Sequence, residues 1–439
     1  MSNSYWQPLN MANGGLGIEI TRGEQAHLYD SNGKKYVDGY SGLWNVTLGY
    51  NDEDIIEAIV RQVKQLPYVN PITLKTPIVS EVSDILCKIT HDNISKIVYT
   101  CSGSEAIEAA IKISRKYSAM KGKNRKKTAV MENSYHGSYY GSMSASNYEE
   151  AEKEGYGPML EGFISLPLPF SRKKKGNVLD DKEKQYLLQQ LEEILETNKD
   201  TLCSIIIEPV LASGGVIPLF PEYIYKISEF CKTNDILFVC DEVATGFWRT
   251  GSIFCFKKYN IKPDIITISK GINNGYLPLG AVCICQKIEK LFEQNGKILF
   301  HLSTQNANPI CIASALATLK KMNSGDIQAK AENLIKEFQD VISENLVNLN
   351  FVSEVRQVGL MIAIDLVQSL EGNVPIEEKN LYGIVRKCFD KGCIVGMAYS
   401  TNISSAILIF PSYIMSNNDV KEVIKIVKES IMEELHKED

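Results

Sequence analysis

Residues 264–285 read DIITISKGINNGYLPLGAVCIC, two short apolar runs joined by a loop of glycine, asparagine and proline. Apolar runs of this kind are typical of strands that are buried on both faces of a parallel sheet. Two earlier stretches, CSIIIEPV at 203–210 and ILFVCDEV at 236–243, have the same character, and a helical spacing at 223–233 separates them. This alternation of apolar strands and helices predicts a doubly wound α/β domain with a mostly parallel sheet.

The length of the chain predicts more than one domain. Its 439 residues exceed the size at which single hydrophobic cores stop growing. After Pro309 the pattern changes to long amphipathic helices and then to a smaller α+β unit. We expect an N-terminal segment (1–60) that packs with the small domain, a large α/β domain (61–315) and a C-terminal small α+β domain (316–439). The small domain is thus expected to be built from both termini.

Charge and composition argue against several kinds of partner. The net charge is −6 and the pI is about 5.6, so we expect no nucleic-acid partner. No apolar run reaches the roughly 20 residues that cross a bilayer, and the first residues lack the pattern of a signal peptide. The eleven cysteines have neither zinc-site nor CxxC spacing. We expect a cytoplasmic protein with reduced thiols, no metal and no membrane contact.

Two ionisable residues end apolar strands. Lys270 follows DIITIS at the carboxyl end of a strand, which is where open α/β sheets bind ligands. Burial there lowers the pKa of a lysine, as a Schiff-base amine requires. Asp241 closes FVCD and could keep a pyridine nitrogen protonated, while Val243 could pack against a flat ring. Taken singly, a surface lysine and an aspartate that caps a turn are equally good interpretations.

Three further elements fall on the same sheet edge. Ser102, Gly103 and Ser104 lead from a strand into an alanine-rich helix, whose first N–H groups could hold a phosphate. The simpler alternative is a capping box. His136, in SYHG, alone indicates a structural histidine more often than a catalytic one, although an aromatic residue at this place could stack on a ring. Glu208 ends the 203–210 strand and could instead form a structural ion pair.

Five stretches occur in an order typical of one protein family: SGSEAIEAAIK, YHG, IIEPV, DEVATGFWRTG and ISKGINNGYLPLGA. They resemble the class III, or omega-type, pyridoxal-phosphate aminotransferases. The Lys-Gly pair that follows Asp241 by 29 residues is especially specific. The resemblance covers nearly the whole chain and implies a fold-type I architecture, pyridoxal 5'-phosphate as cofactor, and a homodimer with shared active sites.

The resemblance also implies roles for individual residues around the cofactor ring. Lys270 would form the Schiff base and then move the proton between substrate and cofactor. Asp241 would pair with the pyridinium nitrogen. Val243 and Tyr135 would lie on the two faces of the ring. Lys270 and Asp241 are therefore the predicted catalytic residues.

Other residues are implied at the phosphate and substrate ends. Thr304, five residues before Pro309, matches a threonine that reaches the phosphate from the neighbouring subunit. Trp44, in GLWNV, matches an aromatic residue of the substrate pocket, to which Tyr135 also belongs. The remaining predicted cofactor-binding residues are Ser102, Gly103, Ser104, His136 and Glu208.

The chain departs from the family pattern in three places. Asn306 and Ala307 stand where the family often has two glycines or a serine and a glycine, at the rim of the phosphate site. Trp248 replaces a glycine in GFGRTG. Most importantly, neither arginine nor lysine occurs between Lys391 and Lys421, where family members that act on amino or keto acids place an arginine for the substrate carboxylate.

The predicted activity is transamination by a ping-pong mechanism between an amine donor and a carbonyl acceptor, both small molecules. The missing arginine indicates that at least one substrate lacks a carboxylate beside the reacting carbon, as in specialised metabolism. A racemase or aminomutase of the same fold is the alternative, because it would use the same residues. A cofactor-binding protein without catalysis is a third interpretation.

Overall fold

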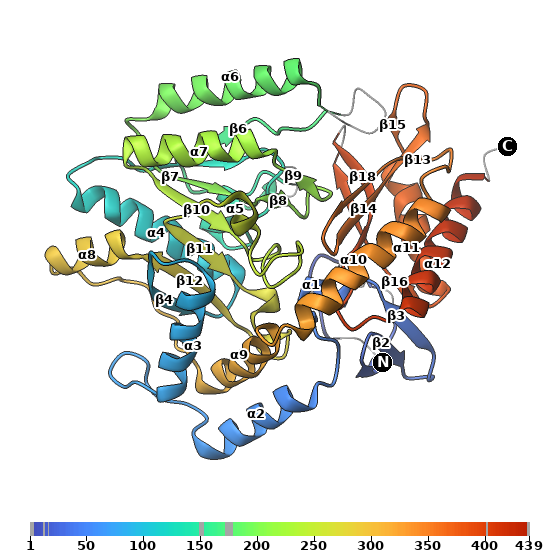
Figure 1. The fold of residues 1–439 in the computed structure, drawn as a ribbon, viewed down its shortest axis with the longest axis horizontal. Coiled ribbons are helices and arrows are strands. Elements are labelled where there is room, and N and C mark those ends of the chain that lie inside the picture. The colour runs from blue at the N-terminus through green and yellow to red at the C-terminus, as the bar shows by residue number, and fades with distance from the viewer. Residues whose placement is uncertain are drawn as a thin grey trace.

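A computed structural model describes residues 4–11, 14–15, 17–148, 153–171, 179–400 and 403–436. Its largest sheet has seven strands, shown near the centre of Figure 1. All neighbours are parallel except where β12 pairs with β11 and β4. The order across the sheet is β4 (Ile94–Thr100), β12 (Gly280–Cys285), β11 (Ile265–Ile268), β10 (Leu237–Asp241), β7 (Leu202–Ile207), β5 (Lys127–Met131) and β6 (Phe163–Leu166). The predicted doubly wound α/β fold with a mostly parallel sheet is confirmed.

The strands of this sheet are apolar because helices cover them. Every residue of β7, β10 and β11 is buried. Helix α4 contacts β7, β11 and β12, and helix α7 contacts β7 and β10. The helices of this part are α2 (Glu53–Gln65), α3 (Pro77–Ile89), α4 (Gly103–Met120), α5 (Tyr140–Ala145), α6 (Asp181–Asn198), α7 (Pro221–Asn234), α8 (Gln286–Gln294) and α9 (Pro309–Met322). Proline begins α3, α7 and α9, where its missing N–H costs no helical hydrogen bond.

A second sheet lies beside helices from the end of the chain. It consists of β13 (Val352–Val358), β14 (Met361–Ser369), β18 (Ser404–Ile409) and β17 (Gly396–Ser400), with β15 (Val374–Pro375) paired to β14. The helices α10 (Asp326–Asn345) and α11 (Glu378–Asp390) both contact α12 (Asn417–Leu435). Among the described residues, no helix has the length and apolar character of a membrane span.

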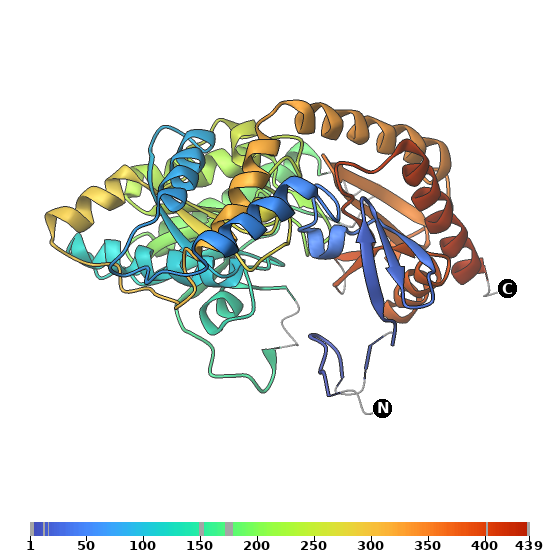
Figure 2. The same cartoon turned by 90° about the horizontal axis from the view of Figure 1, so that it is seen from below.

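The first strands of the chain join this C-terminal part. β1 (Ile20–Glu24), β2 (His27–Asp30) and β3 (Lys35–Asp38) form an antiparallel meander. β3 then pairs in parallel with β16 (Cys393–Ile394), so that Val37 lies opposite Cys393. Figure 2 shows these strands beside the C-terminal helices. Both chain ends therefore contribute to one sheet, while the boundaries at residues 60 and 315 stay predictions.

Candidate active site

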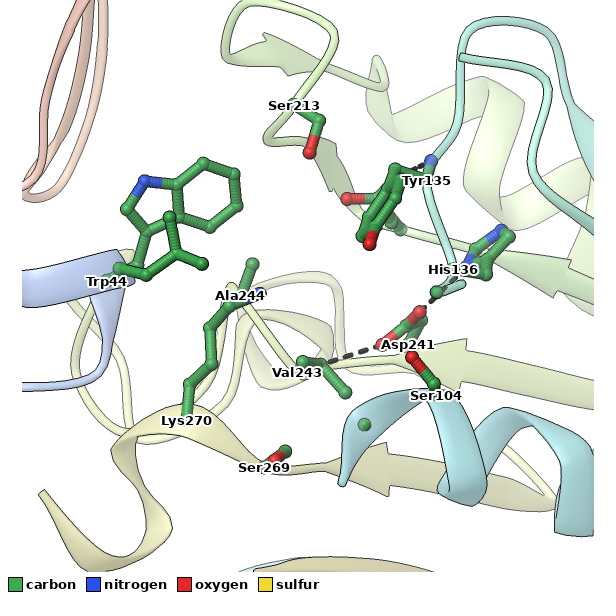
Figure 3. Close-up of a pocket in the computed structure, with 14 residues that line it drawn as sticks. Trp44, Ser104, Tyr135, His136, Ser213, Asp241, Val243, Ala244, Ser269 and Lys270 are labelled. Atoms are coloured by element: carbon green, nitrogen blue, oxygen red, sulfur yellow. Dashed lines mark hydrogen bonds and ion pairs between the residues drawn. The ribbon is translucent and has the colours of Figure 1, made fainter. Parts of the chain in front are cut away.

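The predicted site residues gather around one cavity at the carboxyl ends of β7, β10 and β11 (Figure 3). All of them line this cavity except Ser102 and Thr304. Leu43, Gly137, Ser213, Ala244 and Ser269 also line it and were not predicted. The chain order of the sheet explains the arrangement, because parallel strands direct their carboxyl ends to the same edge.

Lys270 points its amine into the cavity. It begins the short 3-10 helix Lys270–Asn273, with a backbone φ of 38°, an uncommon value for a residue other than glycine. Its Nζ lies 4.6 Å from the ring centroid of Trp44. Burial lowers the pKa of this amine and the charge of Arg249 lowers it further, whereas Asp241 and Glu208 oppose the shift. The site thus favours a neutral, nucleophilic lysine.

Asp241 is held in a fixed orientation by three neighbours. Its Oδ1 accepts hydrogen bonds from the Val243 N–H and the Thr267 hydroxyl, both at 3.1 Å. Its Oδ2 lies 2.7 Å from Nδ1 of His136, whose side chain is fully buried. Burial alone would lower the pKa of His136, but the hydrogen bond and the charge of Asp241 raise it overall. Thr267 was missed, although it lies directly opposite Asp241 in the β10–β11 register.

Glu208 is buried and organises two loops. Its carboxylate accepts hydrogen bonds from the N–H groups of Tyr135, at 3.0 Å, and Ala212, at 3.2 Å. Burial and the charge of Asp241 raise the pKa of Glu208 to about 7, against the opposing effect of His136. Its partners are backbone groups, so the alternative of a simple surface ion pair does not describe it.

The start of α4 approaches the cavity closely. A Cβ on Gly103 would lie 2.9 Å from Cγ1 of Val243, and a Cβ on Gly137 would lie 2.3 Å from Oγ of Ser104. Gly137 has a φ of 131°, which only glycine adopts readily. Ser102 caps the helix by accepting a hydrogen bond from the Glu105 N–H at 3.1 Å. The capping role of Ser102 is therefore seen directly, and its role in binding stays a prediction.

Two side chains bound a flat space beside Asp241. Figure 3 shows Tyr135 on one side of this space and Val243 on the other. The Tyr135 hydroxyl shares a hydrogen bond with Ser138 at 2.9 Å, which fixes the phenol ring in place. This spacing can accept a planar ring whose nitrogen faces Asp241.

Trp44 forms an aromatic wall with a residue that was not predicted. Its indole stacks on Phe410 with ring centroids 4.6 Å apart and an interplanar angle of 12°. Tyr40 meets Trp44 edge-on at 5.9 Å. The sequence gives little sign of Phe410, because the contact joins residues from opposite ends of the chain.

The two arginines nearest this wall are fully engaged with the protein. Arg249 is 1% exposed, and its guanidinium donates to the carbonyl oxygens of Pro411, at 2.6 Å, and Leu360, at 3.3 Å. Arg356 pairs with Asp365 at 2.7 Å and with Glu354 at 2.8 Å. Neither guanidinium lines the cavity.

Thr304 lies outside this cavity, in an exposed loop before α9. Its carbonyl oxygen accepts a hydrogen bond from the Tyr68 hydroxyl at 2.9 Å. Large apolar side chains nearby in the same two segments are exposed, namely Ile72, Leu74, Ile298, Phe300 and Leu302. Such a cluster of exposed apolar residues is typical of a surface that another protein covers.

Comparisons with known proteins agree with this geometry. The family model described as aminotransferase class-III matches residues 10–431. The putrescine–pyruvate aminotransferase of Pseudomonas aeruginosa is 30% identical over 94% of this chain and 90% of its own length. A thermostable (S)-enantioselective omega-transaminase from Thermomicrobium roseum superposes with a TM-score of 0.87 at 29% identity, covering 98% of this chain and 96% of that one. The aminotransferase of Vibrio fluvialis, solved in its PMP-bound form, has a TM-score of 0.88 at 25% identity over 96% and 93% of the two chains.

Proposed function

Because the chain belongs to the class III aminotransferases, which use pyridoxal phosphate, we propose that the cavity around Lys270 is its active site, with Lys270 and Asp241 as the catalytic residues. One observation carries this assignment. An amine with a lowered pKa, a fixed carboxylate and the start of α4 all face a single cavity.

The residues fit the chemistry of this cofactor at each end. The phosphate needs N–H and O–H donors, which the first turn of α4 and Ser104 supply. The ring needs a narrow space, which Gly103 keeps open because a Cβ there would collide with Val243. The ring nitrogen needs an ionised acid, and Asp241 is positioned for that role by His136.

When bound, the cofactor supplies an electrophilic carbon and an electron-withdrawing ring. Lys270 would hold the cofactor through Nζ and, once released by the incoming amine, would carry the proton as a general base and acid. Asp241 would keep the ring nitrogen protonated. The stacked pair of Trp44 and Phe410 would keep water away from the amine of Lys270 and form a wall for the substrate.

We further propose that at least one substrate lacks a carboxylate next to the reacting carbon. Among the described residues that line the cavity, the cationic side chains are Lys270 and, when protonated, His136. Arg249 and Arg356 are bound by carbonyl oxygens and carboxylates of the protein. A buried carboxylate without a cation costs several kcal/mol, so the site disfavours such substrates.

A pair of matched acceptors tests this proposal. A methyl ketone should be used with a higher kcat/KM than the 2-keto acid of the same carbon skeleton, because the acid would bury an unpaired charge. The measurement is single-turnover decay of the amino form of the enzyme with each acceptor. A preference for the keto acid of roughly a hundredfold, about 2.7 kcal/mol, would reveal a cationic clamp and refute the proposal.

A homodimer with shared active sites is also proposed. The exposed apolar residues beside Thr304 support it, because they form a surface that a second copy of the chain could cover. In such a dimer Thr304 would reach the phosphate site of the partner. The exposed position of Thr304, away from the cavity of its own chain, fits this arrangement.

Mixed dimers test the role of Thr304. Lys270→Ala and Thr304→Asp subunits should each be inactive alone, the second because a carboxylate repels the phosphate. A hybrid dimer contains one site with both native residues, so random exchange of equal amounts should restore at most about a quarter of native activity. Native mass spectrometry confirms exchange, and each variant incubated alone is the control. Hybrid dimers without activity would place Thr304 in the site of its own subunit.

We also propose the division of the chain at residues 60 and 315. The pairing of β3 with β16 supports a small domain built from both termini. A cytoplasmic location stays a prediction.

A further inference from the structure

The loop that carries Thr304 is tied to the first turn of α4 by a network that we call the Glu105 latch, consisting of Glu105, His301 and Asn306. Glu105 is buried, and its carboxylate accepts a hydrogen bond from Nδ2 of Asn306 at 3.1 Å. It also lies 3.2 Å from Nε2 of His301. The other carboxylate oxygen accepts a hydrogen bond from the Cys101 N–H at 2.7 Å.

The hydrogen-bond roles within the latch follow from its neighbours. Lys112 places Nζ 3.3 Å from Nδ1 of His301. An ammonium group can only donate, so Nδ1 accepts and Nε2–H donates to Glu105. Burial and the charge of Lys112 both lower the pKa of His301, which fits this neutral tautomer.

Asn306 holds the turn around Thr304 from the other side. Its side-chain oxygen accepts a hydrogen bond from the Ser303 N–H, and Oγ of Ser303 lies 3.5 Å from Sγ of Cys101. Ala307 has a left-handed φ of 54°, which costs free energy for a residue with a Cβ. The turn therefore depends on the side chain of Asn306, and an alanine there would leave Ser303 N–H and Glu105 without this partner.

We propose that Glu105, His301 and Asn306 are positioning residues, which hold Thr304 at the cofactor phosphate of the partner subunit. The inference rests on the proposed dimer with shared sites. Glu105 stands in the same helical turn as Ser104, which faces the phosphate site of its own subunit. Each latch thus joins the two phosphate sites of the dimer. Asn306, one of the departures from the family pattern, is the residue through which this chain makes the connection.

Cofactor binding to the apoprotein tests the latch without an activity assay. Asn306→Ala should weaken pyridoxal 5'-phosphate about tenfold, as expected for loss of one hydrogen bond to a charged group. It should leave pyridoxal, which lacks the phosphate, unchanged. Absorbance titration of both compounds gives the two Kd values. Gln305→Ala is the matched control, because Gln305 is exposed in the same loop and its side-chain amide contacts Asn308 rather than Glu105.

Equal affinities of Asn306→Ala and the native protein for pyridoxal 5'-phosphate would overturn the latch. Weakening of both compounds alike would show a general disturbance of the site and would also overturn it. Should the alanine variant not fold, Asn306→Asp takes its place with the same expectation. The aspartate retains an acceptor for Ser303 N–H but sets a second carboxylate against Glu105.

Hybrid dimers separate failure of the latch from failure of the shared site. An isotope-labelled Asn306→Ala subunit is paired with a native subunit, given limiting pyridoxal 5'-phosphate and reduced with borohydride. The cofactor label on the Lys270 peptide should then be more abundant in the Asn306→Ala subunit, because its site receives an intact loop from the native partner. Equal labelling would overturn the latch. More label in the native subunit would show that the loop serves its own chain, which overturns the shared site.

Discussion

Replacing Lys270 with alanine should lower kcat by at least about 10⁴-fold, roughly 5 kcal/mol, because a single side chain supplies both the nucleophile and the general base. The protein should still bind pyridoxal 5'-phosphate without a covalent bond, since the start of α4 and Asp241 remain in place. Steady-state kinetics and an absorbance titration measure the two effects.

Borohydride reduction and peptide mapping complete the test of Lys270. In the native protein the label should map to Lys270, and in Lys270→Ala it should be absent. Lys262→Ala is a suitable control, because this exposed lysine pairs with Asp92 away from the cavity and its loss should leave kcat unchanged. A label on another lysine of the native protein would remove Lys270 from its assigned role.

Replacing Asp241 with asparagine should slow the reaction about 10³-fold, or roughly 4 kcal/mol, the contribution typical of a preorganised electrostatic partner. The amide has nearly the same shape but no charge to keep the ring nitrogen protonated. Cofactor binding should persist, because the phosphate contacts are unchanged. Pre-steady-state kinetics with a saturating donor isolates the chemical step.

The matched control for this substitution is Asp264→Asn. Asp264 lies just before β11, remote from the cavity, where its carboxylate accepts a hydrogen bond from the Phe238 N–H and pairs with Lys287. Its loss should lower stability while the rate per folded, cofactor-loaded molecule stays near native. If Asp241→Asn also reacts at a nearly native rate, a different group must protonate the ring nitrogen.

The sequence predicted the parts of the site that depend on one element at a time. Lys270 and Asp241 were found because each follows an apolar strand, and parallel strands end at one edge of the sheet. Thr267 was missed because its contact with Asp241 depends on the register between β10 and β11. Phe410 was missed because it meets Trp44 only when both chain ends have folded against the cavity. Periodicity carries no information about either contact.

The pairing of β3 with β16 has a consequence for synthesis of the chain. Val37 leaves the ribosome 356 residues before its partner Cys393. At roughly 5–20 residues per second, this interval lasts about 20–70 s. During translation β3 therefore remains an unpaired strand edge, the kind of backbone that associates most readily with other nascent chains. The first strands made are among the last to be completed, and the exposure of this edge sets a period in which the growing polypeptide depends on protection from aggregation.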